Sequence, residues 1–370
     1  MRIRILPVVA MLILLLSSCG EDVKIDADVS IEVVKKPKRI IFLIGDGMGT
    51  SQMSSAYFYS ENEPNFSRMP VTGFIKTSST SKITDSAAGA TAFSCGKKTY
   101  NGALGVDADT SRVENITERL KKSIPGISVG LVATSSITHA TPAAYYAHID
   151  SRQKAEEIML QLATSQVDFF AGGGKNYVFD RSDSIDALAE FMKAGFDVDT
   201  SAMLKKDWEA GKRYGYLLAS DGMPEAPIRD NFLMKGSLAA IEYLARSESS
   251  FLMIEGSQID WAGHSNDVEW LKDEVLDFDA VLGSVLDWAE KDGETLVVVT
   301  ADHETGGYSL SAYISEDGMS GSYDTIVPSF STLGHSATLV PVLAYGPGSE
   351  AFMGIYENTA IFHKMVDAIE

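Results

Sequence analysis

The sequence contains only two cysteines, Cys19 and Cys95, in 370 residues. Cys19 closes an N-terminal segment that we expect to be processed, so Cys95 is the single thiol left for the folded chain. An intramolecular disulfide is therefore excluded even in an oxidising compartment. We predict that Cys95 is a small buried side chain.

Basic residues are also scarce, with 31 Lys and Arg against 51 Asp and Glu and a net charge of −20. Nucleic acids and anionic membrane surfaces are negatively charged and are poor partners for such a chain. We therefore predict no nucleic-acid binding surface. A hydrophobic content of 45% is nevertheless enough to fill a sizeable core.

The N-terminal apolar run is too short to span a membrane. Ile5–Leu16 has about 12 residues, whereas a spanning helix needs roughly 20. Arg2 and Arg4 precede the run and Ser-Ser-Cys follows it, which predicts a lipoprotein signal peptide at residues 1–18 with a lipid on Cys19. A plain secretory signal is the alternative. Both predict export, to the periplasm or as an outer-membrane lipoprotein.

The next segment, residues 19–37, is polar and charged and contains no aromatic residue, which predicts a tether. Beyond it, no linker divides residues 38–370, and we predict a single catalytic domain. Stretches rich in Pro, Gly and Ser predict small insertions near 221–230 and 311–330.

Apolar runs alternate with amphipathic segments along this domain, as in an α/β fold with a mostly parallel sheet flanked by helices in three layers. The clearest helix is Val268–Glu290, where apolar residues recur three or four apart. The predicted strands cover 39–44, 127–133, 166–170, 251–254, 295–300 and 339–345.

Several strands end in residues that can bind metals. Asp46 follows the run 39–44, Asp302 and His303 follow 295–300, and His335 precedes 339–345. Ligands of open α/β sheets bind at the carboxyl ends of the strands, so these side chains are expected to meet. Asp46 alone could instead cap the following helix.

Asp260 and His264 follow the run 251–254 and are four residues apart, so on a helix they share one face. A carboxylate and an imidazole one turn apart suit Zn²⁺, although an isolated pair of this kind is more often an exposed ion pair. Together with His303 and His335, the pair favours a binuclear zinc site.

The nucleophile candidate is Ser86, in the small-residue run Thr84-Asp-Ser-Ala-Ala-Gly-Ala-Thr-Ala92. At a helix N-terminus, free N–H groups and a nearby cation favour an alkoxide. The alternative is that Ser86 or Asp85 only caps that helix. Arg152 could hold two phosphoryl oxygens, while His148 and His363 are predicted to be packed structural histidines.

Six segments together resemble the alkaline phosphatase family from about Lys38 to the C-terminus. They stand in the family's order and at its spacing: IGDGMG, TDSAAGATAFSCGKKTYNGALGVD, THATPAAYYAHIDSR, EGSQIDWAGH, TADHETGGY and GHSATLVPV.

This resemblance implies hydrolysis of phosphate monoesters through a phosphoserine at Ser86, with Arg152 on the phosphoryl oxygens and Asp85 orienting Arg152. It also implies two Zn²⁺ and one Mg²⁺ per chain, and a homodimer. The implied ligands are Asp260, His264 and His335 for one zinc; Asp46, Asp302, His303 and Ser86 for the second; and Asp46, Thr141 and Glu255 for magnesium.

The sequence departs from the enteric bacterial members at His139 and Trp261, where those members have an aspartate and a lysine. His139 could hydrogen-bond to magnesium-bound water or favour zinc in the third site. Trp261 removes a positive charge near the phosphate, so weaker phosphate retention and faster product release are expected. The same pair occurs in marine and cold-adapted bacterial members.

Two alternatives remain, a phosphodiesterase of the same superfamily and a non-catalytic lipoprotein that binds phosphate or metal. Sulfatases need Pro and Arg two and four residues after the nucleophile, where this chain has Ala88 and Ala90. A binding protein should lack the nucleophile or a ligand, and here neither is missing.

Overall fold

The computed structural model describes residues 36–201, 207–209, 211–315, 318 and 320–370, which belong to one compact unit. The predicted signal peptide, the lipid site at Cys19 and the tether before Lys36 lie outside the described residues. Residues 316, 317 and 319 of the predicted 311–330 insertion do so as well.

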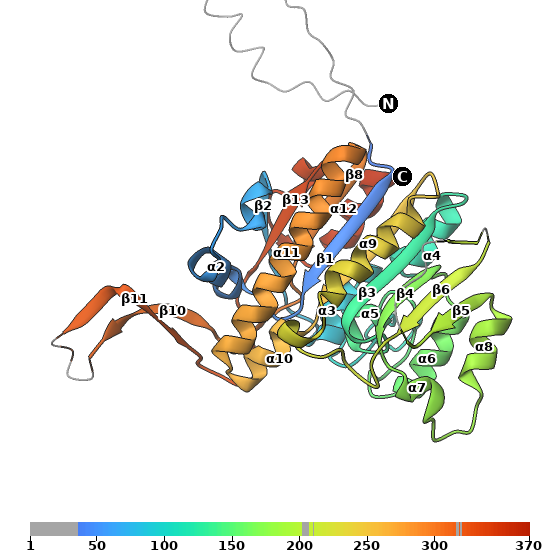
Figure 1. The fold of residues 1–370 in the computed structure, drawn as a ribbon, viewed down its shortest axis with the longest axis horizontal. Coiled ribbons are helices and arrows are strands. Elements are labelled where there is room, and N and C mark those ends of the chain that lie inside the picture. The colour runs from blue at the N-terminus through green and yellow to red at the C-terminus, as the bar shows by residue number, and fades with distance from the viewer. Residues whose placement is uncertain (1–35, 202–206, 210, 316–317, 319) are drawn as a thin grey trace, which may run out of the picture. The chain divides into compact units, whose positions relative to one another are not determined.

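A ten-stranded sheet forms the centre of this unit, in the order β14-β2-β13-β8-β1-β7-β3-β4-β6-β5 (Figure 1). Its pairs are parallel except those of β13 with β2 and β8. The predicted α/β class is therefore confirmed. The strands are β1 (Arg39–Gly45), β2 (Val71–Lys76), β3 (Ser128–Ser136), β4 (Phe169–Gly173), β5 (Phe196–Asp199), β6 (Arg213–Leu217), β7 (Ser250–Gly256), β8 (Thr295–Thr300), β13 (Val340–Tyr345) and β14 (Gly354–Glu357).

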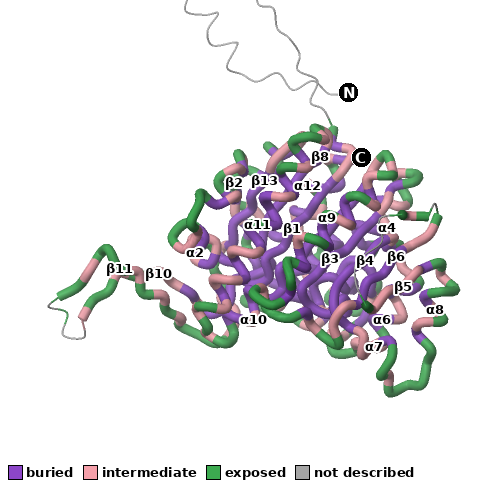
Figure 2. The backbone as a smooth tube through the Cα atoms, viewed as in Figure 1, coloured by how far each residue is buried: buried purple, intermediate pink, exposed green. Residues whose placement is uncertain are grey.

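Helices cover both faces of the sheet, so the central strands are buried on both sides (Figure 2). Helices α9 (Phe232–Leu244) and α11 (Val268–Asp292) cross in front of it in Figure 1. Behind it lie α3 (Ser86–Cys95), α5 (Ala140–Ala143) and α12 (Ala360–Ile369). The other helices are α2 (Thr50–Tyr59), α4 (Ile116–Ser123), α6 (Ala155–Ala163), α7 (Asn176–Phe179), α8 (Ala187–Lys193) and α10 (Gln258–Ser265), with short 3₁₀ turns at Asn65–Arg68, Ala226–Ile228 and Ser349–Phe352.

Helix α11 is the amphipathic helix that the periodicity predicts, extended by one half-turn. Asp267 caps its first turn by accepting a hydrogen bond from the Trp270 N–H, and Gly293 ends it in the left-handed conformation. Most of its apolar side chains, Leu271 and Phe278 among them, are buried, whereas Trp270, Leu276 and Trp288 are only partly buried. Within the described residues, no helix combines the length and the apolar character needed to cross a membrane.

The predicted insertion at 311–330 forms most of a hairpin of β10 (Ser309–Ile314) and β11 (Gly321–Ser329). Figure 1 shows this hairpin extending away from the central sheet. Among the described strands, these two pair only with each other. At its base, β9 (Glu304–Thr305) pairs with β12 (His335–Ser336), so the residues just before and just after the hairpin lie side by side.

Candidate metal centre and nucleophile

The candidate site lies at the carboxyl ends of four neighbouring strands, β8, β1, β7 and β3. Asp302 and His303 follow β8, Asp46 follows β1, and Glu255 lies near the end of β7. Because these strands are parallel, their ends meet along one edge of the sheet. The sheet order thus brings together acids that are more than 200 residues apart in the chain.

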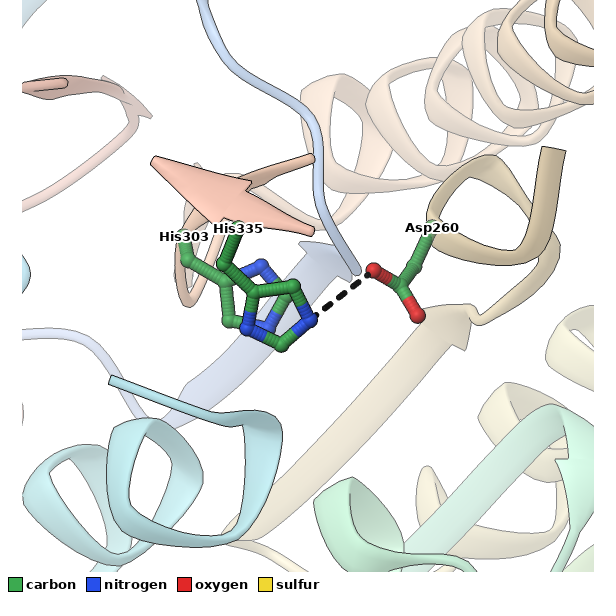
Figure 3. Close-up of side chains that lie close together, drawn as sticks. All are labelled: Asp260, His303 and His335. Carbon is green, nitrogen blue, oxygen red and sulfur yellow. Dashed lines mark ion pairs between the residues drawn. The ribbon is translucent and has the colours of Figure 1, made fainter. Parts of the chain in front are cut away.

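Asp260, His264 and His335 form a first cluster. Nε2 of His264 and Nε2 of His335 are 3.1 Å apart, and they lie 3.4 and 3.5 Å from Oδ1 of Asp260. Helix α10 begins directly after β7 and carries Asp260 and His264 four residues apart, on one face. His335 comes from β12, and Figure 3 shows it pointing at Asp260. Three side chains of two types that suit Zn²⁺, one carboxylate and two imidazoles, therefore point at one another.

A second cluster surrounds Nε2 of His303. This atom lies 3.6 Å from Oδ1 of Asp46, 3.3 Å from Oδ2 of Asp302 and 3.4 Å from Oγ of Ser86. The imidazole of His303 stacks on that of His335, with ring centroids 3.6 Å apart, so the two clusters are adjacent. Asp46, Asp302 and His303 form a group whose ligand atoms could hold one metal ion.

A third group combines Asp46, Glu255 and His139. Oε2 of Glu255 accepts hydrogen bonds from the hydroxyls of Ser257, at 2.6 Å, and Ser135, at 3.1 Å. Burial raises the pKa of the Glu255 carboxyl group, and the nearby hydroxyl of Thr141 opposes that rise. Asp46 therefore faces both the second and the third group.

The residues of the site fit a bound cation. Both carboxylate oxygens of Asp46, Oε1 of Glu255 and Oδ2 of Asp302 are buried without a hydrogen-bond partner. Desolvation, and then the charges of Asp302 and Asp260, raise the pKa of Asp46 well above its usual value. Desolvation also raises the pKa of Glu255 to about 7. Buried acids so arranged need positive charge to stay ionised.

Ser86 is the first residue of α3, and Asp85 is its N-cap. Oδ1 of Asp85 accepts a hydrogen bond from the N–H of Ala88 at 3.0 Å. Capping is thus done by Asp85, and the hydroxyl of Ser86 points to the second cluster at the positive end of the helix. The alternative that Ser86 itself caps the helix is excluded.

Arg152 is held from two sides. Nη1 donates to Oδ2 of Asp85 at 3.3 Å, and Nη2 donates to Nε2 of His139 at 2.9 Å. Desolvation and the Arg152 charge lower the pKa of His139 to about 3, so its imidazole is neutral. The guanidinium has five N–H donors, so most remain for another ligand.

Trp261 also contacts His139, with the ring centroids 5.9 Å apart in an edge-on arrangement. The backbone of the 221–230 segment passes against the indole. A Cβ atom at Gly222 would lie 2.5 Å from Cη2 of Trp261. Gln258 anchors this segment by donating to the carbonyl of Met223 at 2.7 Å. The indole therefore has a fixed position next to His139.

The structure also decides several of the simpler alternatives. Asp46 does not cap α2, because the N-cap is Gly49. Asp260 is buried, so Asp260 and His264 are not an exposed pair. Cys95 is buried as predicted. The prediction for His363 was wrong: it lies on the exposed side of α12, because the buried positions of that helix are Ile361, Met365, Val366 and Ile369.

Three polar side chains of the site were missed from the sequence. Ser135 and Ser257 hold Glu255, and Thr305 donates to Oδ1 of Asp260 at 2.5 Å. Each stands within two residues of a strand end or of a predicted ligand. That proximity was the available signal, but serine and threonine are common there for structural reasons.

Known proteins share both the sequence and the fold. Alkaline phosphatase 4 of Bacillus subtilis is 34% identical over 87% of this chain and 86% of its own length. The structure of alkaline phosphatase from the Antarctic bacterium TAB5 is 49% identical, with a TM-score of 0.87 over 90% of this chain and 99% of that one.

A TAB5 variant with a histidine changed to aspartate, described with Mg bound in the M3 site, is 48% identical, with a TM-score of 0.87 over 91% of this chain and 99% of that one. Residues 37–324 match the family described as alkaline phosphatase. This chain therefore belongs to the alkaline phosphatase family of phosphate monoester hydrolases.

Proposed function

We propose that this chain hydrolyses phosphate monoesters to an alcohol and inorganic phosphate through a phosphoserine at Ser86. The observation that carries the proposal is the position of Ser86 Oγ. It lies 3.4 Å from Nε2 of His303, at the N-terminus of α3 and beside the carboxylates of the second cluster. Ser86 is the nucleophile candidate named from the sequence, and its hydroxyl lies in this position.

In the first step Oγ of Ser86 attacks phosphorus, the Oγ–P bond forms, and the P–O bond to the alcohol breaks. The alcohol leaves with a proton. In the second step a water molecule attacks phosphorus and breaks the Oγ–P bond, which releases phosphate and restores Ser86. Arg152 binds two phosphoryl oxygens in both steps, because Asp85 and His139 hold its guanidinium next to Ser86.

We further propose two zinc ions and one magnesium ion per chain. Asp260, His264 and His335 would hold one zinc, and Asp46, Asp302, His303 and Ser86 the other. Asp46, Thr141 and Glu255 offer oxygen ligands alone, as Mg²⁺ prefers. When bound, such ions supply Lewis acidity that stabilises charge on the attacking and leaving oxygens. The buried oxygens without partners support this assignment.

The hydrogen bond from Arg152 bears on the third site. An arginine can only donate, so Nε2 of His139 must accept, and a neutral imidazole then carries its proton on Nδ1. A protonated Nδ1 is not a metal ligand. We therefore propose that His139 donates to an oxygen at the third site, and that the site takes magnesium rather than zinc.

Export and assembly remain proposals too. The leader pattern supports export as a lipoprotein anchored through Cys19, in the periplasm or on the outer membrane, and Cys19 lies outside the described residues. A homodimer is supported by exposed apolar side chains on α2 and on the β10–β11 hairpin. These are Tyr57, Phe58, Tyr313, Ile314, Tyr323 and Val327.

The test compares turnover of an aryl phosphate monoester with turnover of the matching diester, with zinc and magnesium at alkaline pH. A ratio far above one is expected. In a second experiment, the reaction with a ³²P-labelled monoester is stopped with acid during turnover. The label is expected on the peptide containing Ser86. A ratio below one would move the activity to phosphodiesters. Turnover without label on Ser86 would refute the phosphoserine.

A further inference from the structure

Each histidine of the two proposed zinc sites presents Nε2 to the site, while its Nδ1 lies within hydrogen-bond distance of a group outside the proposed ligands. Nδ1 of His264 donates to the carbonyl of Leu333 at 2.6 Å, and Nδ1 of His335 donates to the carbonyl of Thr84 at 2.8 Å. Nδ1 of His303 instead lies 3.2 Å from Oγ1 of Thr305. Of these three partners, only the last is a side chain.

The direction of the hydrogen bonds at Thr305 follows from the proton count. Nε2 of His303 must be unprotonated to bind a metal, so Nδ1 carries the proton and donates to Oγ1 of Thr305. The hydroxyl has one proton of its own, and it goes to Oδ1 of Asp260 at 2.5 Å. That same Oδ1 faces Nε2 of His264 and Nε2 of His335.

The Thr305 hydroxyl has little freedom to move. Its residue is fully buried, its N–H donates to the carbonyl of Gly47 at 3.1 Å, and its carbonyl accepts from Nε2 of Gln52 at 2.8 Å. Gly47 has a positive φ of 72°, and a Cβ atom there would lie 2.7 Å from Oγ1 of Thr305. The loop after β1 thus closes over the hydroxyl without displacing it.

We propose that Thr305 is a positioning residue that couples the two zinc sites, an inference that rests on the proposed function. The path from His303 Nδ1 through Thr305 Oγ1 to Asp260 Oδ1 joins a ligand of one site to a ligand of the other. A cation on Nε2 of His303 makes Nδ1–H a stronger donor, which strengthens the next hydrogen bond to Asp260. Loss of the hydroxyl should therefore weaken zinc binding at both sites.

The test uses three variants of the full chain. Thr305→Val keeps the shape and removes the hydroxyl, while Thr305→Ser keeps the hydroxyl. Thr300→Val is the structural control, because its buried hydroxyl donates to the carbonyl of Pro341 at 2.9 Å, away from the ligands. Zinc affinity is measured by competition with a chromogenic chelator, and the absorption spectrum of the Co²⁺-loaded protein reports ligand geometry.

We expect Thr305→Val to lose about 10- to 100-fold in zinc affinity at both sites, as for other partners of metal-bound histidines, with an altered Co²⁺ spectrum. Thr305→Ser and Thr300→Val should bind zinc like the wild type, even if thermal unfolding shows that both are destabilised. Zinc binding by Thr305→Val that equals the wild type would overturn the inference alone. A wild type that binds no zinc would overturn the proposed zinc sites as well.

Discussion

Nη2 of Arg152 donates a hydrogen bond of 2.9 Å to Nε2 of His139. The same guanidinium is held on its other side by Asp85, the N-cap of the helix that Ser86 begins. The group proposed to bind phosphate and the proposed nucleophile are therefore positioned through one aspartate. His139, which follows β3, makes a second contact with the guanidinium. Because Nε2 of His139 accepts this hydrogen bond, the proton of the neutral imidazole is on Nδ1.

Replacing His139 by alanine should raise the KM for a monoester about 2- to 10-fold, because Arg152 loses one of its two hydrogen-bond partners. Steady-state kinetics measure the change. His363→Ala is the matched control, since His363 is exposed on α12. An unchanged KM in His139→Ala would show that Asp85 positions Arg152 without help.

Ser86→Ala should lower kcat by at least about 10³-fold, because the proposed covalent step loses its nucleophile. Binding of the two zinc ions should be largely kept, since histidines and carboxylates supply most of the ligands. Ser94→Ala serves as control for a buried hydroxyl on the same helix. A Ser86→Ala protein with near-normal turnover is incompatible with the proposed mechanism.

Arg152→Lys should lower kcat/KM for a monoester roughly 10- to 100-fold, since a lysine cannot contact two phosphoryl oxygens in one plane. The exposed Arg112→Lys variant controls for a general effect of charge type. Equal kcat/KM for Arg152→Lys and wild type would remove Arg152 from the phosphate site.

Trp261→Lys should lower the inhibition constant of inorganic phosphate by roughly 10-fold, because a cation would return to the phosphate surroundings. Slower product release should accompany the tighter binding. Trp261→Gln removes the indole without adding charge and should not lower the inhibition constant of phosphate. An inhibition constant that is the same in Trp261→Lys and wild type would end the product-release hypothesis.

Stability of the metal-free protein should fall as pH rises from about 4.5 to about 7. Desolvation raises the pKa of Glu255 to about 7, so the folded state binds this proton more tightly than the unfolded state. The stabilising proton is fully present below the unfolded value of 4.5 and is lost above 7. Glu255→Gln should flatten the dependence of Tm on pH in this range, whereas the exposed Glu61→Gln should not. Parallel curves for wild type and Glu255→Gln would contradict the raised pKa.

The sequence predicts the fold class and the strands that carry the site, because the length and spacing of apolar runs indicate which segments are buried. Asp46, Asp302 and His303 were located by one further rule, that ligands gather at the carboxyl ends of parallel strands. The order of the strands is not predictable in this way. It depends on which apolar faces pack together, and it is this order that places Glu255 beside Asp46.

The hydrogen bonds of hydroxyl groups such as that of Thr305 could not be predicted from the sequence, for a different reason. A threonine two residues after a predicted ligand is usually a strand residue, and its bonding depends on the turn of Gly47 and the approach of α10. The exposure of His363 likewise depends on which face of α12 packs on the sheet.

The two-residue ladder of β9 and β12 encloses the β10–β11 hairpin between two proposed zinc ligands, His303 and His335. Backbone hydrogen bonds from Gly306 to Gly334, and from Ser331 and Thr332 to Gly306, close the neck of this segment. These backbone hydrogen bonds fix the separation of the proposed ligands on either side of the neck, so that separation should not depend on the length of chain beyond it. A hairpin of different length or sequence should therefore be able to present a different surface while the proposed ligands keep their positions.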